Sequence, residues 1–185
     1  MTRDDIRAGK PILTERLILR PYRDDDLPFL AAMNGDDEVM RYLGGTMTAA
    51  ESNAMAARIN AKLASHGHGM AAVERRADGQ LLGMCGMSYE VWYPDVLELG
   101  WRLARPFWGQ GYATEAGRAW ARIAFEVYGE KRLISIADAP NDNSTAVMKR
   151  LGFTFDHAAE LDDDGEKFAA VIYAITRDAW RAQAG

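Results

Sequence analysis

Six consecutive residues, Trp108-Gly109-Gln110-Gly111-Tyr112-Ala113, have the composition of a site that binds phosphate. The small residues allow the backbone to approach a ligand closely, and a helix that begins here leaves its first N–H groups without intrahelical partners. The helix dipole adds a positive potential at the same end. Two common phosphate motifs are excluded, because Thr114 replaces the third glycine of the dinucleotide fingerprint and no Gly-Lys-Ser/Thr follows as in a P-loop. A strand-to-helix connection without a ligand is the alternative.

The residues on either side of this turn predict the elements that position it. From residue 97 to residue 103, apolar residues alternate with polar or small ones, which is the period of a β-strand. Pro106 ends the strand, because proline cannot donate to a ladder. After Gly111 the apolar residues recur at helical spacing as far as Val127.

The same two periods predict the rest of the chain. Residues 1–10 are polar and are expected to be loose, and the three aspartates at 24–26 are expected to cap a helix and face solvent. Thr48 with Glu51 forms a capping box, and Gly152 suits the left-handed end of a helix. The other expected elements are a strand at 13–22, helices after Asp24, at 36–43 and from Thr48 to before Gly67, a hairpin of 70–75 and 81–89, a strand at 132–138, a helix at 141–151 and a closing hairpin of 153–157 and 168–175.

Three ordered segments resemble the GNAT N-acetyltransferases. In the family's acetyl-CoA signature, Arg/Gln-x-x-Gly-x-Gly/Ala, Gly111 and Ala113 fill the last two places, while Trp108 departs at the first. Glu98-Leu-Gly-Trp and Trp-Gly-Gln-Gly-Tyr-Ala-Thr-Glu-Ala are similar to the RimJ/RimL-type ribosomal-protein branch. The other two segments are Thr14-Glu-Arg-Leu-Ile-Leu-Arg-Pro21 and Asn141-Asp-Asn-Ser144 running into Val147-Met-Lys-Arg-Leu-Gly-Phe153.

The resemblance implies one α/β (α+β) domain over residues 1–185, in which helices flank a mixed, mostly antiparallel sheet of about six to seven strands. It also implies N-acetyl transfer from acetyl-CoA to a primary amine in a ternary complex, without a metal. The acceptor implied is a protein N-terminus or a small amine. The residues implied to hold acetyl-CoA are Leu99, Trp101, Leu103, Trp108, Gly109, Gln110, Gly111, Tyr112, Ala113, Thr114 and Asn141.

Acetyl transfer needs a neutral amine and a protonated leaving thiol. Deprotonating a lysine-like amine at pH 7 costs roughly 4.6 kcal/mol, against about 1.1 kcal/mol for an α-amine. The family often has a carboxylate near the position of Glu98, which is therefore the candidate base, with Glu90 and Asp95 in reserve. An ion pair between Glu98 and Arg102 is the alternative.

The general acid is less clear from the resemblance. Met148 stands where many family members have an acidic tyrosine, and the RimJ/RimL-type branch points instead to Ser144. Helix capping is the alternative for both Ser144 and Asn141. Because the tyrosine is absent, a non-catalytic acyl-CoA-binding or regulatory protein on the same fold is the second function considered.

The acceptor side is predicted with equal alternatives. Tyr42, Trp92 and Tyr93 are candidate substrate contacts, and a role in the core or in covering the sheet is the alternative for each. His66 and His68 lie close together, but no carboxylate or cysteine nearby completes a metal site, so a loop is expected.

Composition limits the classes of function. With 185 residues, 48% of them hydrophobic and 26% charged, the chain suits one globular domain. A net charge of −5 argues against a general nucleic-acid binder, and the lone Cys85 excludes an intrachain disulfide and a cysteine-cluster metal site. No stretch predicts a membrane span or a signal peptide, so a cytoplasmic protein is expected, either a monomer or a homodimer.

Overall fold

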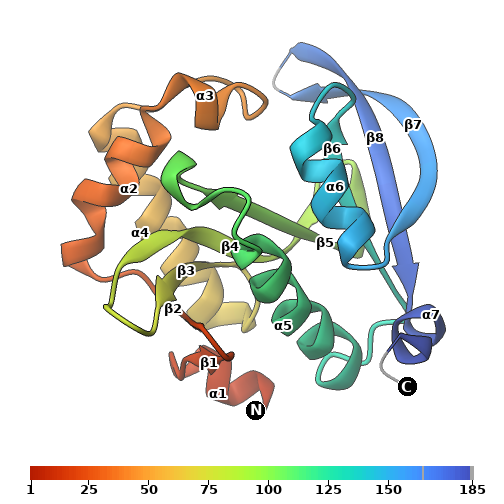
Figure 1. Ribbon diagram of the computed structural model, residues 1–185, viewed down its shortest axis with the longest axis horizontal. Helices are drawn as coiled ribbons and strands as arrows, with labels where there is room; N and C mark the ends of the chain where they lie inside the picture. The colour runs from red at the N-terminus through yellow and green to blue at the C-terminus, as the bar shows by residue number, and fades with distance from the viewer. Residues whose placement is uncertain (164, 184–185) are drawn as a thin grey trace.

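The computed structural model describes residues 1–163 and 165–183, which fold around one twisted sheet (Figure 1). Asp164, at the tip of the predicted closing hairpin, lies outside the described residues. The elements in chain order are α1 (Arg3–Arg7), β1 (Ile12–Leu13), β2 (Leu17–Arg20), η1 (Asp24–Asp26), α2 (Leu27–Asn34), α3 (Asp37–Met40), α4 (Ala49–His66), β3 (Met70–Arg75), β4 (Leu81–Glu90), β5 (Tyr93–Leu103), η2 (Arg105–Phe107), α5 (Tyr112–Glu126), β6 (Arg132–Asp138), α6 (Asp142–Arg150), β7 (Thr154–Asp163), β8 (Glu166–Thr176) and α7 (Arg177–Ala182).

The sheet has eight strands in the order β1-β2-β3-β4-β5-β6-β8-β7. Among the described residues, β5 and β6 pair in parallel and every other neighbouring pair is antiparallel. The mixed, mostly antiparallel sheet is therefore confirmed, with one strand more than the six to seven expected. The extra strand arises because the segment predicted as one strand at 13–22 turns at Thr14, whose Oγ1 accepts from Leu17 N at 2.9 Å. Ile12 thereby pairs with Leu19.

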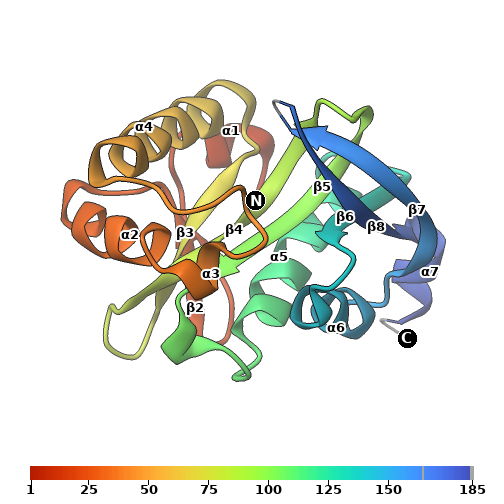
Figure 2. The same cartoon turned by 90° about the horizontal axis from the view of Figure 1, so that it is seen from above.

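Helices cover both faces of the sheet (Figure 2). On one face, α2 and α4 pack on β3 and β4 through a cluster that includes Leu30, Ala56 and Met84. On the other face, α5 packs on the middle strands through the larger core, where Trp120 is fully buried. The amphipathic pattern of residues 111–127 is thus confirmed as the α5 helix.

The N-terminal residues expected to be loose instead form α1. Thr2 and Asp5 make a capping box, which provides partners for the first free N–H groups of the helix. Ile6 is only 5% exposed, because it joins the larger core. Burial of this single apolar side chain explains why a polar segment is ordered.

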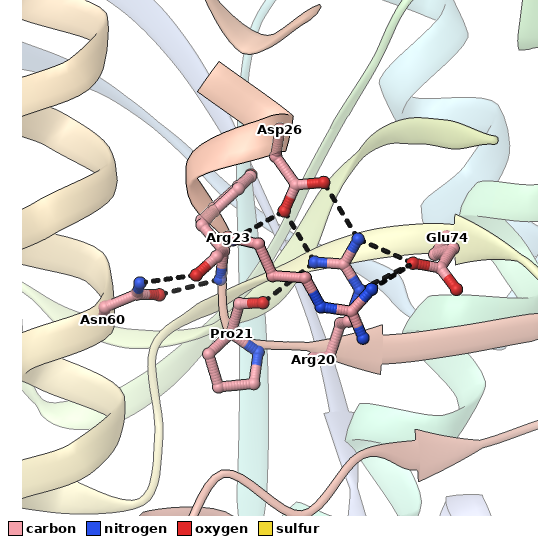
Figure 3. A network of polar contacts seen from close by, with 7 residues as sticks. Arg20, Pro21, Arg23, Asp26, Asn60 and Glu74 are labelled. Atoms are coloured by element: carbon pink, nitrogen blue, oxygen red, sulfur yellow. Dashed lines mark hydrogen bonds and ion pairs between the residues drawn. The ribbon is translucent and has the colours of Figure 1, made fainter. Parts of the chain in front are cut away.

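The aspartates at 24–26 were expected to face solvent, and Asp26 does not. It is 7% exposed and receives two hydrogen bonds from the guanidinium of Arg20, at 2.6 and 2.9 Å (Figure 3). Glu74 on β3 completes the pairing, with an oxygen 2.6 Å from Arg20 Nη2. The buried arginine therefore ties β2 to both β3 and the start of α2.

Candidate active site

The predicted phosphate turn is held open by two glycines in the left-handed region. Gly109 and Gly111 have φ values of 73° and 81°, which glycine adopts without strain. A Cβ atom would meet nothing within 4 Å at Gly109, and only Arg16 Nη2 at 3.4 Å at Gly111. Gly109 therefore faces open space and Gly111 faces only the end of the Arg16 side chain, beside the first turn of α5, where backbone N–H groups lack intrahelical partners.

Two side chains of the turn donate hydrogen bonds to backbone carbonyls of the residues that precede it. Trp108 Nε1 donates to Leu103 O at 2.6 Å, and Gln110 Nε2 donates to Pro106 O at 2.7 Å. These bonds fix the side chains of Trp108 and Gln110, so the backbone is the part of the turn left to meet a ligand.

Arg16, Thr14 and Glu115 brace the turn from outside. Arg16 Nη1 donates to Gln110 O at 3.1 Å, and its Nε contacts Glu115 Oε2 at 2.6 Å. Thr14 Oγ1 donates to the other Glu115 oxygen at 2.6 Å. Both residues lie in segments that resemble the family, but the sequence alone does not predict their contact, because 99 residues separate Arg16 from Glu115.

Thr114 lies in the first turn of α5 with a buried hydroxyl that has no hydrogen-bond partner among the described residues. A buried polar group without a partner costs free energy, so it indicates a group that arrives with a ligand. Together with the open glycines, this hydroxyl fits an anionic group at the N-terminus of α5.

Strands β5 and β6 separate beside this turn. Their parallel ladder consists of two pairs among the described residues, Leu97 with Leu133 and Glu98 with Ile134. From Leu99 to Leu103, the corresponding edge of β5 has no strand partner within the same part of the chain. Leu99, Trp101 and Leu103, the three residues of β5 predicted to contact acetyl-CoA, lie along this unpaired stretch. Leu99 and Leu103 are buried and Trp101 is half-buried.

Glu98 lies at the point of separation. Its Oε1 accepts from Ile136 N at 3.2 Å, in place of a ladder bond. The pKa of Glu98 is raised to about 7, chiefly by burial and also by the negative charge of Glu90, while the Ile136 bond acts in the opposite direction. Such a carboxyl can both take and release a proton near neutral pH.

The alternative assigned to Glu98, an ion pair with Arg102, is wrong for the described residues. Arg102 Nη1 donates instead to Asn34 Oδ1 on α2, at 2.8 Å. Of the two reserve carboxylates, Asp95 is exposed, whereas Glu90 accepts a hydrogen bond from Ser88, the residue directly opposite Glu98 on β4.

Ser144, the predicted general acid, and Asn141, the predicted pantetheine contact, both lie at the start of α6. Asn141 Oδ1 accepts from Ser144 N at 3.1 Å, so Asn141 is the N-cap. Capping is therefore confirmed for Asn141 and is wrong for Ser144, whose hydroxyl makes no hydrogen bond within the described residues. Met148, in the place of the family tyrosine, is fully buried and cannot reach solvent.

The predicted acceptor residues are not gathered in one place. Tyr42 is half-buried just after α3. Trp92 Nε1 donates to Asp162 O at 2.8 Å, and the hydroxyl of Tyr93 lies 2.8 Å from His157 Nε2. Both aromatic side chains thus pack against β7 and β8, and Tyr93 belongs to β5, which begins before the strand predicted from residue 97. A separate hollow of about 410 Å³ is lined by Asp36, Arg105, Pro106 and Trp108.

Comparison with known proteins identifies the family. The family model described as "Acetyltransferase (GNAT) domain" matches residues 16–154. The chain belongs to the GNAT acetyltransferase family. The match spans the phosphate turn, Glu98 and the start of α6, which are the three parts of the candidate site.

Individual relatives agree with this membership. The FsC-acetyl coenzyme A-N(2)-transacetylase of Aspergillus fumigatus is 29% identical, over 95% of this chain and 80% of its own length. An acetyltransferase structure from Agrobacterium tumefaciens has a TM-score of 0.77 and 28% identity, covering 90% of this chain and 94% of that one. A GNAT-family acetyltransferase from Bacillus anthracis shares the fold with a TM-score of 0.78 at 22% identity, covering 91% and 99% respectively.

In residues 1–163 and 165–183, no helix has the length and apolar character to cross a membrane. The same residues contain no group of three or more His, Cys, Asp or Glu side chains placed to hold a metal ion.

Proposed function

We propose that this GNAT protein transfers an acetyl group from acetyl-CoA to a primary amine by direct attack in a ternary complex. The observation that carries the proposal is Glu98, a carboxyl with a pKa raised to about 7 at the point where β5 and β6 separate. A general base works best when its pKa lies near the operating pH. Membership of an acetyltransferase family supplies the reaction class.

The residues around the turn fit acetyl-CoA. Backbone N–H groups of Gly111, Tyr112 and Ala113 and the free Thr114 hydroxyl would hold its phosphates, and Asn141 would contact its pantetheine arm. The edge of β5 from Leu99 to Leu103, which has no strand partner among the described residues, would lie along that arm. When bound, acetyl-CoA supplies the acetyl group: a C–N bond forms to the amine, and the C–S bond breaks.

Two residues of the chain would handle the protons. Glu98 takes one from the attacking amine, which is most valuable when that amine is lysine-like with a pKa near 10.4. Ser144 gives one to the departing sulfur, and its hydroxyl has no competing hydrogen bond among the described residues. The acceptor class is a protein N-terminus or a small amine, with Tyr42, Trp92 and Tyr93 as candidate contacts.

The substitution Glu98→Gln tests this function. It keeps the shape and removes the base, so turnover should fall by about 10²-fold or more near neutral pH. The wild-type kcat/KM should rise with pH and change slope near 7, and the mutant should lose that inflection. The measurement is CoA release, detected as free thiol, over a panel of amines and peptides between pH 6 and 9.

Glu126→Gln, an exposed change on α5, serves as the control and should behave as wild type. The Tm increase given by acetyl-CoA should be the same in both variants and the wild type. A small loss that is uniform across the pH range would contradict the role of Glu98 as a base.

The second candidate, a non-catalytic acyl-CoA-binding or regulatory protein, is favoured by one observation. Met148 occupies the place of the family's acidic tyrosine and is fully buried. Thermal stabilisation by acetyl-CoA without CoA release from any amine in the panel would support this candidate.

A further inference from the structure

Arg102 is a cation on the same face of the sheet as Glu98. Side chains four residues apart on one strand point the same way, and the register agrees, because Glu98 lies opposite Ser88 and Arg102 opposite Met84. This is the face covered by α2 and α4. Arg102 is half-buried there.

The guanidinium of Arg102 has few partners. It makes one side-chain hydrogen bond within the described residues, to Asn34 Oδ1 at 2.8 Å. The amide nitrogen of Asn34 in turn donates a hydrogen bond to Ser52 Oγ at 2.9 Å. Arg102 Nε is buried and makes no hydrogen bond within the described residues, and the buried hydroxyl of Tyr22 likewise has no hydrogen-bond partner there. Burial lowers the pKa of Arg102, yet its charge is not neutralised by any carboxylate of the described residues within 4 Å.

Arg20 shows how the same protein treats a buried arginine that has a purely structural role. Asp26 and Glu74 both contact its guanidinium at 2.6 Å (Figure 3). A charge withdrawn from water without a counter-ion is costly, and this cost is offset for the buried Arg20 but not for the half-buried Arg102. The missing anion at Arg102 is therefore best supplied by a ligand.

The face of β5 between Arg102 and Glu98 carries no side chain. Gly100 separates them on the same face, and a Cβ added there would meet nothing within 4 Å. Four residues of extended strand place the Cα atoms of Glu98 and Arg102 about 13 Å apart. An amine at Glu98 and an anion at Arg102 therefore require a spacer of several bonds.

We propose that the acceptor of the transfer reaction is a primary amine that carries a carboxylate on a flexible carbon chain, with the carboxylate bound by Arg102. This inference rests on the proposed function, and it names the substrate class of the same site. Bidentate binding of a carboxylate is the geometry that a guanidinium favours. The aliphatic amine at the other end is the kind that most needs Glu98 as a base.

The test compares two amines that differ at one end only. In 6-aminohexanoate a carboxylate takes the place of the terminal methyl group of hexylamine. For the wild type, kcat/KM should be at least tenfold higher for 6-aminohexanoate. In Arg102→Gln that preference should vanish, because the KM for 6-aminohexanoate should rise at least tenfold more than the KM for hexylamine.

Two further variants guard against misfolding. Arg102→Lys keeps the charge and should retain part of the preference, and Arg118→Gln removes an exposed arginine of α5 and should retain all of it. Circular dichroism melts check that each variant is folded. A folded Arg102→Gln that keeps the wild-type preference, or a wild type without any preference, would overturn the proposal.

Binding of 6-aminohexanoate, measured by NMR without acetyl-CoA, tests the carboxylate site at Arg102 independently of the proposed transfer function. If no amine is acetylated, the proposed transfer function fails. In that case, binding to the wild type and not to Arg102→Gln still supports the carboxylate site, whereas equal binding to both overturns it.

Discussion

Asn141 and Ser144 lie at one helix end, where we propose that they have two different roles. Asn141 accepts the Ser144 N–H and stabilises the first turn of α6, which leaves the serine hydroxyl available for a proton transfer. Both residue types favour capping, so composition alone could not separate them. The structure separates them, because the side-chain oxygen of Asn141 accepts the hydrogen bond and that of Ser144 does not.

Separate substitutions should divide these roles experimentally. Asn141→Ala should cost about 1 kcal/mol of unfolding free energy, because the cap is lost. Ser144→Ala should leave stability close to wild type while turnover falls by about one to two tenfold steps, since a thiol with a pKa near 8.5 leaves readily without help. Urea unfolding and CoA release measure the two effects. Full activity in Ser144→Ala would leave water as the proton donor.

At the residue level, sequence reasoning located Glu98 and could not assess its acidity. The alternating pattern placed it on a strand, but its raised pKa depends on Glu90 from the neighbouring strand and on burial. Arg102 was considered only as a partner for Glu98, because Asn34 is 68 residues away in the chain. Both properties arise from tertiary contacts.

At the scale of elements, the turn and α5 form one unit whose backbone faces the proposed cofactor. Gly111 is the N-cap and has no side chain to occupy the space in front of the helix. Arg16 and Glu115 secure the same turn, and Arg16 Nη2 would lie 3.4 Å from a Cβ atom at Gly111. A Cβ atom at Gly109 would meet nothing within 4 Å, so a phosphate can approach the turn there.

Gly111→Trp should abolish the Tm increase produced by acetyl-CoA, because the indole fills that space. A ligand that binds only the folded state raises stability by about 2.7 kcal/mol at 100 times its Kd. Gly129→Trp is the control, since Gly129 likewise has a left-handed backbone, with a φ of 72°, and an added Cβ there would meet nothing within 4 Å, but it lies after α5. A folded Gly111→Trp that keeps the full shift would place the phosphate site elsewhere.

Elements with strong local signals were predicted well. The capping box of Thr48 and Glu51 starts α4, and Gly67 ends it in the left-handed region. Two short helices were missed because tertiary contacts order them. Ile6 of α1 is buried in the core, and Trp180 of α7 packs on Phe125 with ring centroids 5.7 Å apart.

For the molecule as a whole, buried His68 links folding to pH. It is 8% exposed, and burial together with the charges of Lys62, His66 and Arg3 lowers its pKa to about 4. Its Nδ1 is buried without a partner among the described residues. The folded protein therefore holds the neutral imidazole where an unfolded chain would bind a proton.

Stability should consequently fall on acidification between pH 6.5 and about 4, by up to about 3 kcal/mol, and should not depend on this group above pH 6.5. His68→Gln should flatten the decline in that window, whereas His66→Gln, at an exposed neighbour, should leave most of it. Urea midpoints at pH 7, 5.5 and 4.5 measure the effect. An equal decline in His68→Gln would assign the acid sensitivity to other groups.

The two-pair ladder between β5 and β6 also has a mechanical consequence. Glu98 occupies the last rung of that ladder, and its carboxylate takes the N–H of Ile136 just beyond it. Separation of the two strands would break that hydrogen bond and would also admit water to the carboxyl, which relieves the burial that chiefly raises the pKa of Glu98. The proton affinity of Glu98 is therefore tied to the spacing of β5 and β6, and a substitution that loosens this pairing should lower its pKa.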